Sequence, residues 1–432
     1  MQRKIAENFR LWKNKSSGRM PLLVYGARQV GKTYSILEFG KQHYKNIAYF
    51  NLETNRLVSS YFADNIEPTR ILRFLESETR EKIVPGETLI IFDEIQTCER
   101  ALTSLKYFNE LTPEYHIISA GSLLGVAVNR EQYSFPVGNV DSITVFPMDF
   151  EEFLWALSEQ HLSREIRNAY ELNEALPGAL HEKALDLYRQ YLITGGMPGA
   201  VLEYIKTDSF LGVPDAQKKI INDYVADMAK YASNSESVKI RAAYDSIPVQ
   251  LAKENKKFQY KLAQKGGTAA IFGIAIDWLC FAGVVLKCER IEHGYMPVSV
   301  YRDLSGFKLY MGDVGLLTMH SGISQQTILS AGVTGNTFLG AIAENYVAQA
   351  FACKNYNLNY WTSDGTAELD FVLQKGDEII PVEVKAGVHT RSKSMNMFVT
   401  KYKPAYAIRI TSRNYGFENG IKSIPLYAVF CI

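Results

Sequence analysis

The chain of 432 residues is long enough for two to four domains, each with a core of its own. Its hydrophobic content of 47% and charged content of 22% are those of a globular protein, which excludes a disordered or fibrous chain. A net charge of +1 argues against a protein coated by nucleic acid through bulk charge, but it leaves room for a local basic patch.

The cysteines and the N-terminus indicate the compartment. The five cysteines are scattered and form no C-x-x-C pair, which is typical of reduced thiols. No apolar segment follows the first residues, and the longest apolar stretch, residues 269–286, contains Asp277. We therefore expect a cytoplasmic protein with no signal peptide and no contact with a membrane.

The most informative segment follows an apolar run at residues 22–25 and reads Gly-x-x-x-x-Gly-Lys-Thr over residues 26–33. Glycines let the backbone approach a triphosphate, and the start of a helix adds N–H groups and a positive dipole end. The pattern predicts a P-loop that binds ATP, with Lys32 on the β- and γ-phosphates and the hydroxyl of Thr33 on Mg²⁺. The residues expected to bind the nucleotide are Gly26, Ala27, Arg28, Gln29, Val30, Gly31, Lys32, Thr33 and, further along the chain, Ser122.

A second motif lies about sixty residues later, where the apolar run 88–92 ends in Asp93 and Glu94. Such a run is typical of a strand at the centre of a parallel sheet, and its carboxyl end would lie beside the phosphate-binding loop. We expect Asp93 to hold Mg²⁺ through water and Glu94 to activate the attacking water. Lys32 and Glu94 are therefore the candidate catalytic residues of an ATPase. An acidic turn after a strand is the structural alternative, which the nearby loop motif disfavours.

Strand and helix patterns alternate up to about residue 144. Strands are expected over residues 22–25, 46–53, 89–93, 115–122 and 142–146, with a helix over 71–82. This alternation predicts a parallel sheet with helices on both faces. Ser122 ends the fourth strand, where a hydroxyl would lie beside the γ-phosphate, although a Gly-Ser turn explains it equally well. From residue 149 to about 230 the pattern is helical, with a sharp break at 194–199.

The middle of the chain reads as short helices followed by a two-stranded ribbon, with strands over residues 285–291 and 308–311. This order indicates a winged-helix module. A basic run with the interleaved aromatic residues Phe258 and Tyr260 lies in the same region. Its lysines are Lys253, Lys256, Lys257, Lys261 and Lys265. Such a run can contact DNA or RNA, but it is more often the solvated face of a helix.

The last part of the chain combines a helix over residues 340–350 with strands over 367–373 and 379–385. An acid, then about a dozen residues, then Glu-x-Lys is the PD-(D/E)xK nuclease pattern, and residues two apart on a strand share a face. A second divalent metal site would use the acids Glu344, Asp370 and Glu383, with Lys385 orienting a water. A hairpin with cross-strand Glu–Lys pairs is the structural alternative.

Together these blocks resemble a large family of bacterial and archaeal AAA-type ATPases with a C-terminal domain of unknown function that ends in a restriction-endonuclease-like fold. The resemblance rests on the motifs at residues 26–33, 91–96, 120–122, 135–138, 146–153, 195–198, 309–316 and 383–385. It implies a winged-helix segment in the middle and a nuclease-like fold at the end. Relatives often have Gly-Arg where Asn139 follows Gly138 here, so Arg130 or Arg28 would have to replace that arginine, or turnover would be slow.

The expected fold class is α/β with four parts. These are a P-loop core over residues 1–148, a helical region over 149–235, a winged-helix-like segment over 236–330 and a nuclease-like α/β domain over 331–432. The leading hypothesis is a Mg²⁺-dependent ATPase that couples its nucleotide state to a nuclease-like or nucleic-acid-binding domain. The alternative is a slow nucleotide-dependent switch that binds a protein partner through an inactive nuclease-like fold. Self-association into a homo-oligomer is compatible with both.

Overall fold

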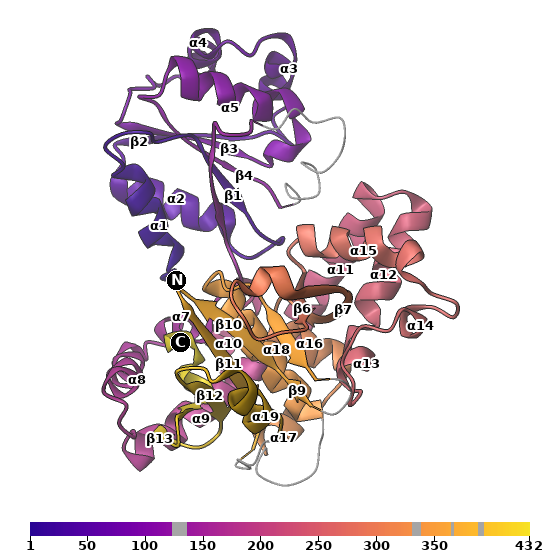
Figure 1. The fold of residues 1–432 in the computed structure, drawn as a ribbon. Helices are drawn as coiled ribbons and strands as arrows, with labels where there is room; N and C mark the ends of the chain where they lie inside the picture. Colours follow the sequence, from indigo (N-terminus) through magenta and orange to yellow (C-terminus); the bar gives the residue numbers. More distant parts are fainter. Residues whose placement is uncertain (123–135, 331–337, 364–366, 388–392) are drawn as a thin grey trace. The chain divides into compact units, whose positions relative to one another are not determined.

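The structure is a computed structural model that describes residues 1–122, 136–330, 338–363, 367–387 and 393–432 (Figure 1). Arg130, a candidate from the sequence, lies outside the described residues. The chain forms two compact units. The N-terminal unit comprises residues 3–146 with 281–283, and the C-terminal unit comprises residues 1–2, 147–280 and 284–432.

The N-terminal unit is built on a parallel sheet of five strands in the order β2-β3-β4-β1-β5. The strands are β1 (Leu22–Tyr25), β2 (Asn46–Asn51), β3 (Thr88–Asp93), β4 (His116–Ala120) and β5 (Asp141–Thr144). The central strands β3 and β4 are buried along their whole length, and residues 89–92 of β3 form the continuous apolar run that is typical of a strand covered on both faces. The predicted α/β class and parallel sheet are confirmed.

Helices cover both faces of this sheet (Figure 1). They are α1 (Ile5–Lys13) and α2 (Lys32–His43) on one face, and α3 (Arg56–Asp64), α4 (Pro68–Thr79) and α5 (Glu99–Leu111) on the other. The helix predicted over 71–82 begins earlier, because Pro68 fits a first helical position and the carboxylate of Glu67 caps it. It ends at Thr79 because Arg80 takes a left-handed conformation with φ 58°.

The helical region predicted over 149–235 contains α7 (Phe150–Ala156), α8 (Gln160–Leu172), α9 (Gly178–Thr194), α10 (Pro198–Thr207) and α11 (Val213–Tyr231). The short helices predicted for the segment that follows are α12 (Asn234–Asp245), α13 (Ile247–Leu251), α14 (Tyr260–Ala263) and α15 (Ala269–Phe281). A capping box starts α7, in which the carboxylate of Asp149 accepts the N–H of Glu152 (2.9 Å) and the carboxylate of Glu152 accepts the N–H of Asp149 (3.1 Å).

Two mixed sheets complete this unit, in the orders β7-β6-β8-β9 and β10-β11-β12-β14-β13. Their strands are β6 (Val285–Ile291), β7 (Arg302–Met311), β8 (Asn359–Thr362), β9 (Glu368–Leu369), β10 (Phe371–Lys375), β11 (Glu378–Val384), β12 (Ala407–Thr411), β13 (Gly416–Glu418) and β14 (Ile421–Pro425). The helices around them are α16 (Val314–Ser321), α17 (Gln325–Leu329), α18 (Phe338–Cys353) and α19 (Lys393–Tyr402).

The structure modifies two predicted features of these sheets. The ribbon of β6 and β7 is present, but β6 also pairs in parallel with β8, so the ribbon belongs to a larger sheet. The strand predicted over 367–373 is broken at Asp370, whose carboxylate accepts the N–H of Val384 (2.8 Å). Its two halves, β9 and β10, join different sheets, whereas the predicted antiparallel pairing with the next strand holds for β10 and β11.

Long-range hydrogen bonds tie the helical region to the sheets of the C-terminal unit. Gly196 donates its N–H to the carboxylate of Asp313 (2.6 Å), and its carbonyl accepts the N–H of Met148 (2.7 Å). A Cβ at Gly196 would lie 1.9 Å from the carbonyl oxygen of Met148, so only glycine fits there. The side chain of Asn414 forms two further bonds with the backbone of Leu176 (3.0 and 2.8 Å). No helix in the described residues is long and apolar enough to span a bilayer.

Candidate functional site

The loop between β1 and α2 has a backbone that turns sharply at its two glycines. Gly26 and Gly31 have φ values of 136° and 90°, a region that glycine occupies without strain. A Cβ on Gly26 would lie 2.2 Å from the carbonyl oxygen of Val145, so this close approach also requires glycine. Because α2 begins at Lys32, its first N–H groups and the positive end of its dipole face the same region as the loop.

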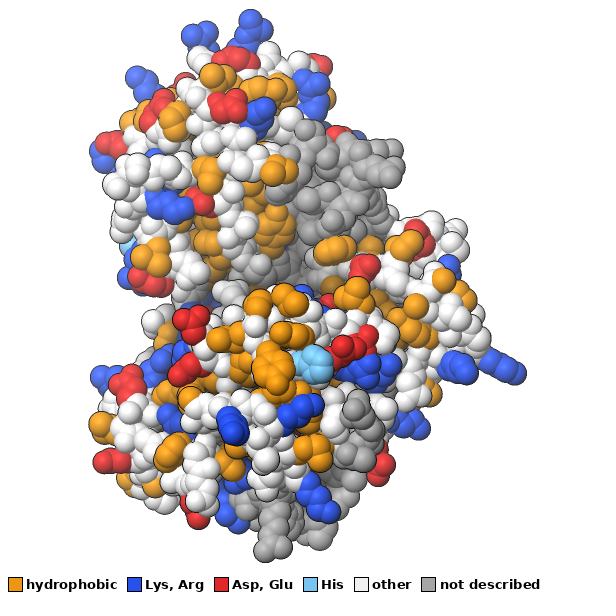
Figure 2. Space-filling model, in the orientation of Figure 1, with side chains coloured by type: hydrophobic (Ala, Val, Ile, Leu, Met, Phe, Trp, Pro, Cys, Tyr) orange, Lys and Arg blue, Asp and Glu red, His pale blue; other side chains and the backbone are white. Residues whose placement is uncertain are grey.

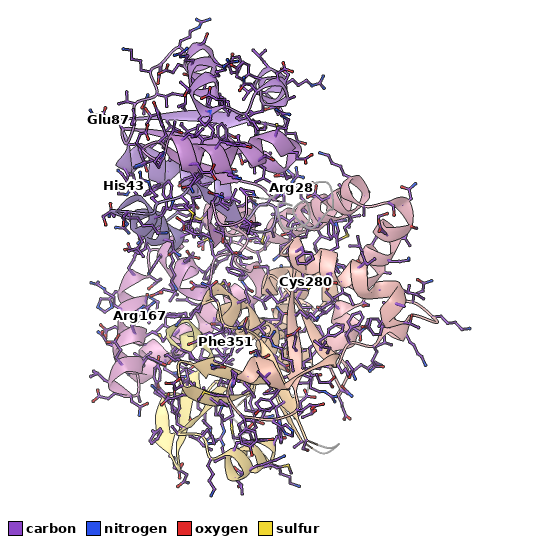
Figure 3. All side chains as sticks on the ribbon, turned by 45° about the horizontal axis from the view of Figure 1, so that its top comes forward. Arg28, His43, Glu87, Arg167, Cys280 and Phe351 are labelled. Atoms are coloured by element: carbon purple, nitrogen blue, oxygen red, sulfur yellow. The ribbon has the colours of Figure 1, made fainter. Side chains whose placement is uncertain are left out.

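The exposed side chain of Arg28, which belongs to this loop, shows at which end of the sheet the loop lies (Figure 3). Figure 3 shows Arg28 on the opposite side of the N-terminal unit from His43, which ends α2, and from Glu87, which precedes β3. The loop between β1 and α2 therefore lies at the carboxyl edge of the parallel sheet, which is where open α/β sheets bind their ligands.

The ammonium group of Lys32 is held inside the loop. Its Nζ donates to the carbonyl oxygens of Gly26 (2.9 Å) and Ala27 (2.8 Å), and the residue is only 7% exposed. This positive charge therefore lies among the backbone groups from which the sequence predicts contacts to phosphates.

Asp93 at the end of β3 lies directly beside the first turn of α2. Its Oδ2 accepts hydrogen bonds from the hydroxyl of Thr33 (2.9 Å) and from the phenol of Tyr49 (2.8 Å). Burial, together with the bond to Asp93, raises the pKa of Tyr49 to about 12, so the phenol stays protonated and donates. The structure thus brings together the two residues from which the sequence predicts Mg²⁺ binding.

Glu94 follows in a left-handed conformation (φ 54°) that turns its side chain away from the strand direction. Its Oε2 accepts a hydrogen bond from the amide of Gln96 (2.5 Å) and lies 3.5 Å from the hydroxyl of Ser122. Because β3 and β4 are neighbours, their carboxyl ends place Glu94 and Ser122 together, although the two residues are 28 positions apart.

Three residues at this site have no role in the predictions from the sequence. Gln96 ends the motif at 91–96, and its position two residues after Glu94 could have indicated a contact with that carboxylate. Tyr49 comes from β2, and Arg3 donates to the carbonyl oxygens of Val30 (2.8 Å) and Phe146 (2.7 Å). Neither of these two carries a local pattern, because each contact joins distant parts of the chain.

The acids predicted to bind a second metal lie in a buried charge cluster of the C-terminal unit. Glu344 on α18 is 2% exposed and bonds to the ammonium groups of Lys256 and Lys308 (3.0 Å for Lys308) and to the phenol of Tyr310. Lys308, which is fully buried, also bonds to Glu368 (2.6 Å). No group of three His, Cys, Asp or Glu side chains among the described residues is arranged to hold a metal ion.

The other two acids of that prediction are also engaged. Lys385 pairs with Glu383 Oε1 (2.9 Å), whereas Glu383 Oε2 is buried and has no hydrogen-bond partner in the described part of the chain. Asp370 lies near Glu344 and accepts the backbone N–H of Val384. Lys256 was predicted as part of a basic run that could contact nucleic acid, and Tyr310 lies in the motif at 309–316, but neither was predicted to bond to Glu344. Lys308 could have been noticed as a single lysine within the apolar residues of β7.

Charge and burial set the protonation of this cluster. Burial disfavours the ionised form of Glu344, but the positive charges of Lys308 and Lys256 outweigh burial and lower its pKa to about 2. For Asp370, burial and the negative charge of Glu344 raise the pKa from 3.8 to about 7. The cluster therefore holds one carboxyl that gains or loses its proton near neutral pH.

The substitution Asp370→Asn is expected to change how stability depends on pH. Because folding raises the pKa of Asp370, the folded wild type keeps a proton between about pH 4 and pH 7 that the unfolded chain releases. Its free energy of unfolding should therefore fall, relative to that of the variant, by up to about 1.4 kcal/mol per pH unit across this window. Urea unfolding at several pH values measures the difference. Asp377→Asn, in the exposed turn between β10 and β11, is the control, and parallel curves for wild type and Asp370→Asn would contradict the prediction.

Three family models match parts of the chain. Residues 18–154 match an AAA domain. Residues 185–327 match a domain of unknown function (DUF8612), and residues 339–429 match another domain of unknown function (DUF4143). The last two matches assign no activity to the C-terminal unit.

Solved structures resemble the chain at low sequence identity. The Walker-type ATPase of Pyrococcus abyssi is 16% identical, with coverage of 74% of this chain and 95% of that chain and a TM-score of 0.46. The Aeropyrum pernix ORC2 protein in ADPNP–ADP complexes is 13% identical (77% and 95% coverage, TM-score 0.37). The Aeropyrum pernix ORC1 protein in complex with DNA is 12% identical (74% and 93%, TM-score 0.32). No curated protein sequence matched the chain.

Proposed function

We propose that the protein binds and hydrolyses ATP in a Mg²⁺-dependent manner and passes its nucleotide state to the C-terminal unit; the match of residues 18–154 to an AAA domain supports this. The observation that carries the proposal is the convergence of three elements at one sheet edge. The loop backbone, the Thr33–Asp93 pair and Glu94 come from β1, β3 and the start of α2, and each supplies a group that phosphoryl transfer to water needs.

Each residue has a defined part in this reaction. The loop N–H groups and Lys32 bind the phosphates, for which Lys32 exchanges its bonds to the Gly26 and Ala27 carbonyls for phosphate oxygens. Thr33 and Asp93 would hold Mg²⁺, which supplies charge stabilisation on the phosphates when it is bound. Glu94 accepts the proton of the attacking water, and Gln96 orients its carboxylate.

For the C-terminal unit, we propose a binding role without nucleic-acid cleavage. Glu344 is already neutralised by Lys256 and Lys308, so its carboxylate is held by ammonium groups at the position where a nuclease would hold a metal. A buried acid with such partners stabilises one packed arrangement instead of exchanging ligands.

The surface favours a protein as the partner of this unit. If the region 236–330 is a winged helix, its helix before the ribbon is α15, which contains no lysine or arginine and exposes Ile271, Ile274 and Asp277. Sequence readout of DNA would need basic or amide side chains there. In Figure 2, Lys and Arg side chains alternate with Asp and Glu on the described part of the visible face of each unit.

ATP turnover with and without nucleic acid tests the proposal. We expect Mg²⁺-dependent hydrolysis that double-stranded DNA, single-stranded DNA and RNA leave unchanged, because the unit is proposed to bind a protein. Phosphate release is measured at low salt, where electrostatic binding is strongest. An absence of Mg²⁺-dependent hydrolysis would contradict the ATPase function, and a several-fold stimulation by DNA or RNA would contradict the choice of partner.

A nuclease remains the second candidate because of Glu383. One of its carboxylate oxygens is buried with no hydrogen-bond partner among the described residues. A buried oxygen without a partner is expected at a site where a cation binds. Incubation of the protein with DNA and RNA under Mn²⁺ decides between the candidates. Cleavage that disappears in Glu383→Gln would favour the nuclease.

A further inference from the structure

We propose that Arg3 is a positioning residue for the phosphate-binding loop. It fixes the direction of one backbone N–H that faces the phosphates, and it joins the loop to the segment through which the chain leaves the N-terminal unit. This inference rests on the proposed function, because it assumes that the loop binds ATP.

Arg3 is buried and forms hydrogen bonds to two backbone carbonyls. The residue is 9% exposed, and its Nη1 and Nη2 donate to two different backbone carbonyls, those of Val30 (2.8 Å) and Phe146 (2.7 Å). The planar guanidinium holds these donors in a fixed relation, so the two carbonyls are held in a fixed relation as well.

The helix that follows Arg3 anchors it. On α1, Phe9 and Trp12 are buried, and the ring of Phe9 packs on that of Phe39 in α2 with centroids 5.3 Å apart. Since α2 starts at the end of the loop, α1 and Arg3 are attached to the same element whose first turn faces the ligand. The arginine is therefore supported by core packing on one side of the loop.

The bond to Val30 acts on the neighbouring peptide group. In a trans peptide the C=O and the following N–H point in opposite directions. When Arg3 binds the carbonyl of Val30, the N–H of Gly31 must point away from Arg3. Gly31 has φ 90° and directly precedes α2, so this N–H is one of the donors that a phosphate would meet at the helix start.

The bond to Phe146 links the loop to the chain exit. Phe146 is the last residue of the N-terminal unit before Pro147 begins the C-terminal unit. The same segment is fixed from the other side, because Val145 donates its N–H to the carbonyl of Tyr25 (2.9 Å). A change in the loop on nucleotide binding is therefore transmitted through Arg3 to the residues that connect the two units.

The test compares Arg3→Ala with Arg3→Lys and with Arg10→Ala, an exposed arginine on α1 that pairs with Glu7. Isothermal titration with Mg-ATP should show affinity that is weaker by roughly tenfold in Arg3→Ala, the loss expected for a charge-assisted hydrogen bond. Arg3→Lys should lose less, because it keeps the charge but cannot bridge both carbonyls. Arg10→Ala should bind as the wild type does.

Two further measurements separate positioning from simple loss of structure. In turnover assays the KM for ATP should rise in Arg3→Ala while kcat changes little, since Asp93 and Glu94 are untouched. Millimolar methylguanidinium should restore part of the lost affinity in Arg3→Ala and leave Arg10→Ala unchanged. Wild-type affinity in Arg3→Ala, or a loss that Arg3→Lys and methylguanidinium do not relieve, would overturn the positioning role alone. A wild-type protein that fails to bind Mg-ATP would overturn the proposed function, and this role with it.

Discussion

Lys32→Ala is expected to weaken Mg-ATP binding by roughly ten- to a hundredfold, which is the range for losing one or two hydrogen bonds between charged groups. The ammonium group of Lys32 is buried inside the loop, where it lies 2.9 Å and 2.8 Å from the carbonyl oxygens of Gly26 and Ala27. Without it, the loop N–H groups and Mg²⁺ would have to balance the charge of the triphosphate.

The matched control for this prediction is Lys41→Ala, an exposed lysine in the last turn of the same helix. It removes one positive charge from α2 without touching the loop, so it should bind ATP as the wild type does. Isothermal titration measures both variants, and thermal unfolding verifies that each is folded. Equal affinities in Lys32→Ala and the wild type would refute nucleotide binding through this loop.

Glu94→Gln is expected to slow ATP hydrolysis by about 10²- to 10⁴-fold while ATP binding is retained, because the amide keeps the shape of the carboxylate but cannot accept the proton of the water. The hydrogen bond from Gln96 at 2.5 Å shows that the carboxylate is already oriented. Single-turnover hydrolysis is the appropriate measurement, since it separates the chemical step from product release.

Glu99→Gln, at the exposed start of α5, serves as the control for the charge change. It should hydrolyse ATP at the wild-type rate. If Glu94→Gln also does so, the base is another residue and the assignment of Glu94 is wrong. If Glu94→Gln no longer binds ATP, Glu94 contributes to the binding of ATP and not only to its hydrolysis.

The N-terminal sheet could be predicted because each of its strands is recognised from a short stretch of consecutive residues. A parallel strand that is buried on both faces is typically an apolar run, and β3 contains such a run over residues 89–92. The loop motif likewise lies within eight consecutive positions, 26–33, so its glycines and lysine can be recognised without knowing the rest of the fold.

The C-terminal cluster could not be predicted in the same way, because its partners are far apart in the chain. Lys256 and Glu344 are 88 positions apart, and Lys308 and Glu344 are 36 apart. The break at Asp370 depends on the N–H of Val384, 14 positions later, and a continuous apolar strand pattern gives no sign of it. A pattern of charges on one strand shows which side chains share a face, but not which lysines will meet them.

The pair of hydrogen bonds between Asn414 and Leu176 spans 238 positions, and this has a consequence for biosynthesis. All strands of the N-terminal sheet lie between residues 22 and 144, so the sheet of the N-terminal unit can form while the ribosome is still translating the later residues. The helices of the C-terminal unit cannot bury their apolar faces fully until the strands β12 to β14 have been synthesised. Contacts that join such distant residues form slowly, so the C-terminal unit completes its core only after β14 (Ile421–Pro425) has been synthesised, later than the N-terminal unit.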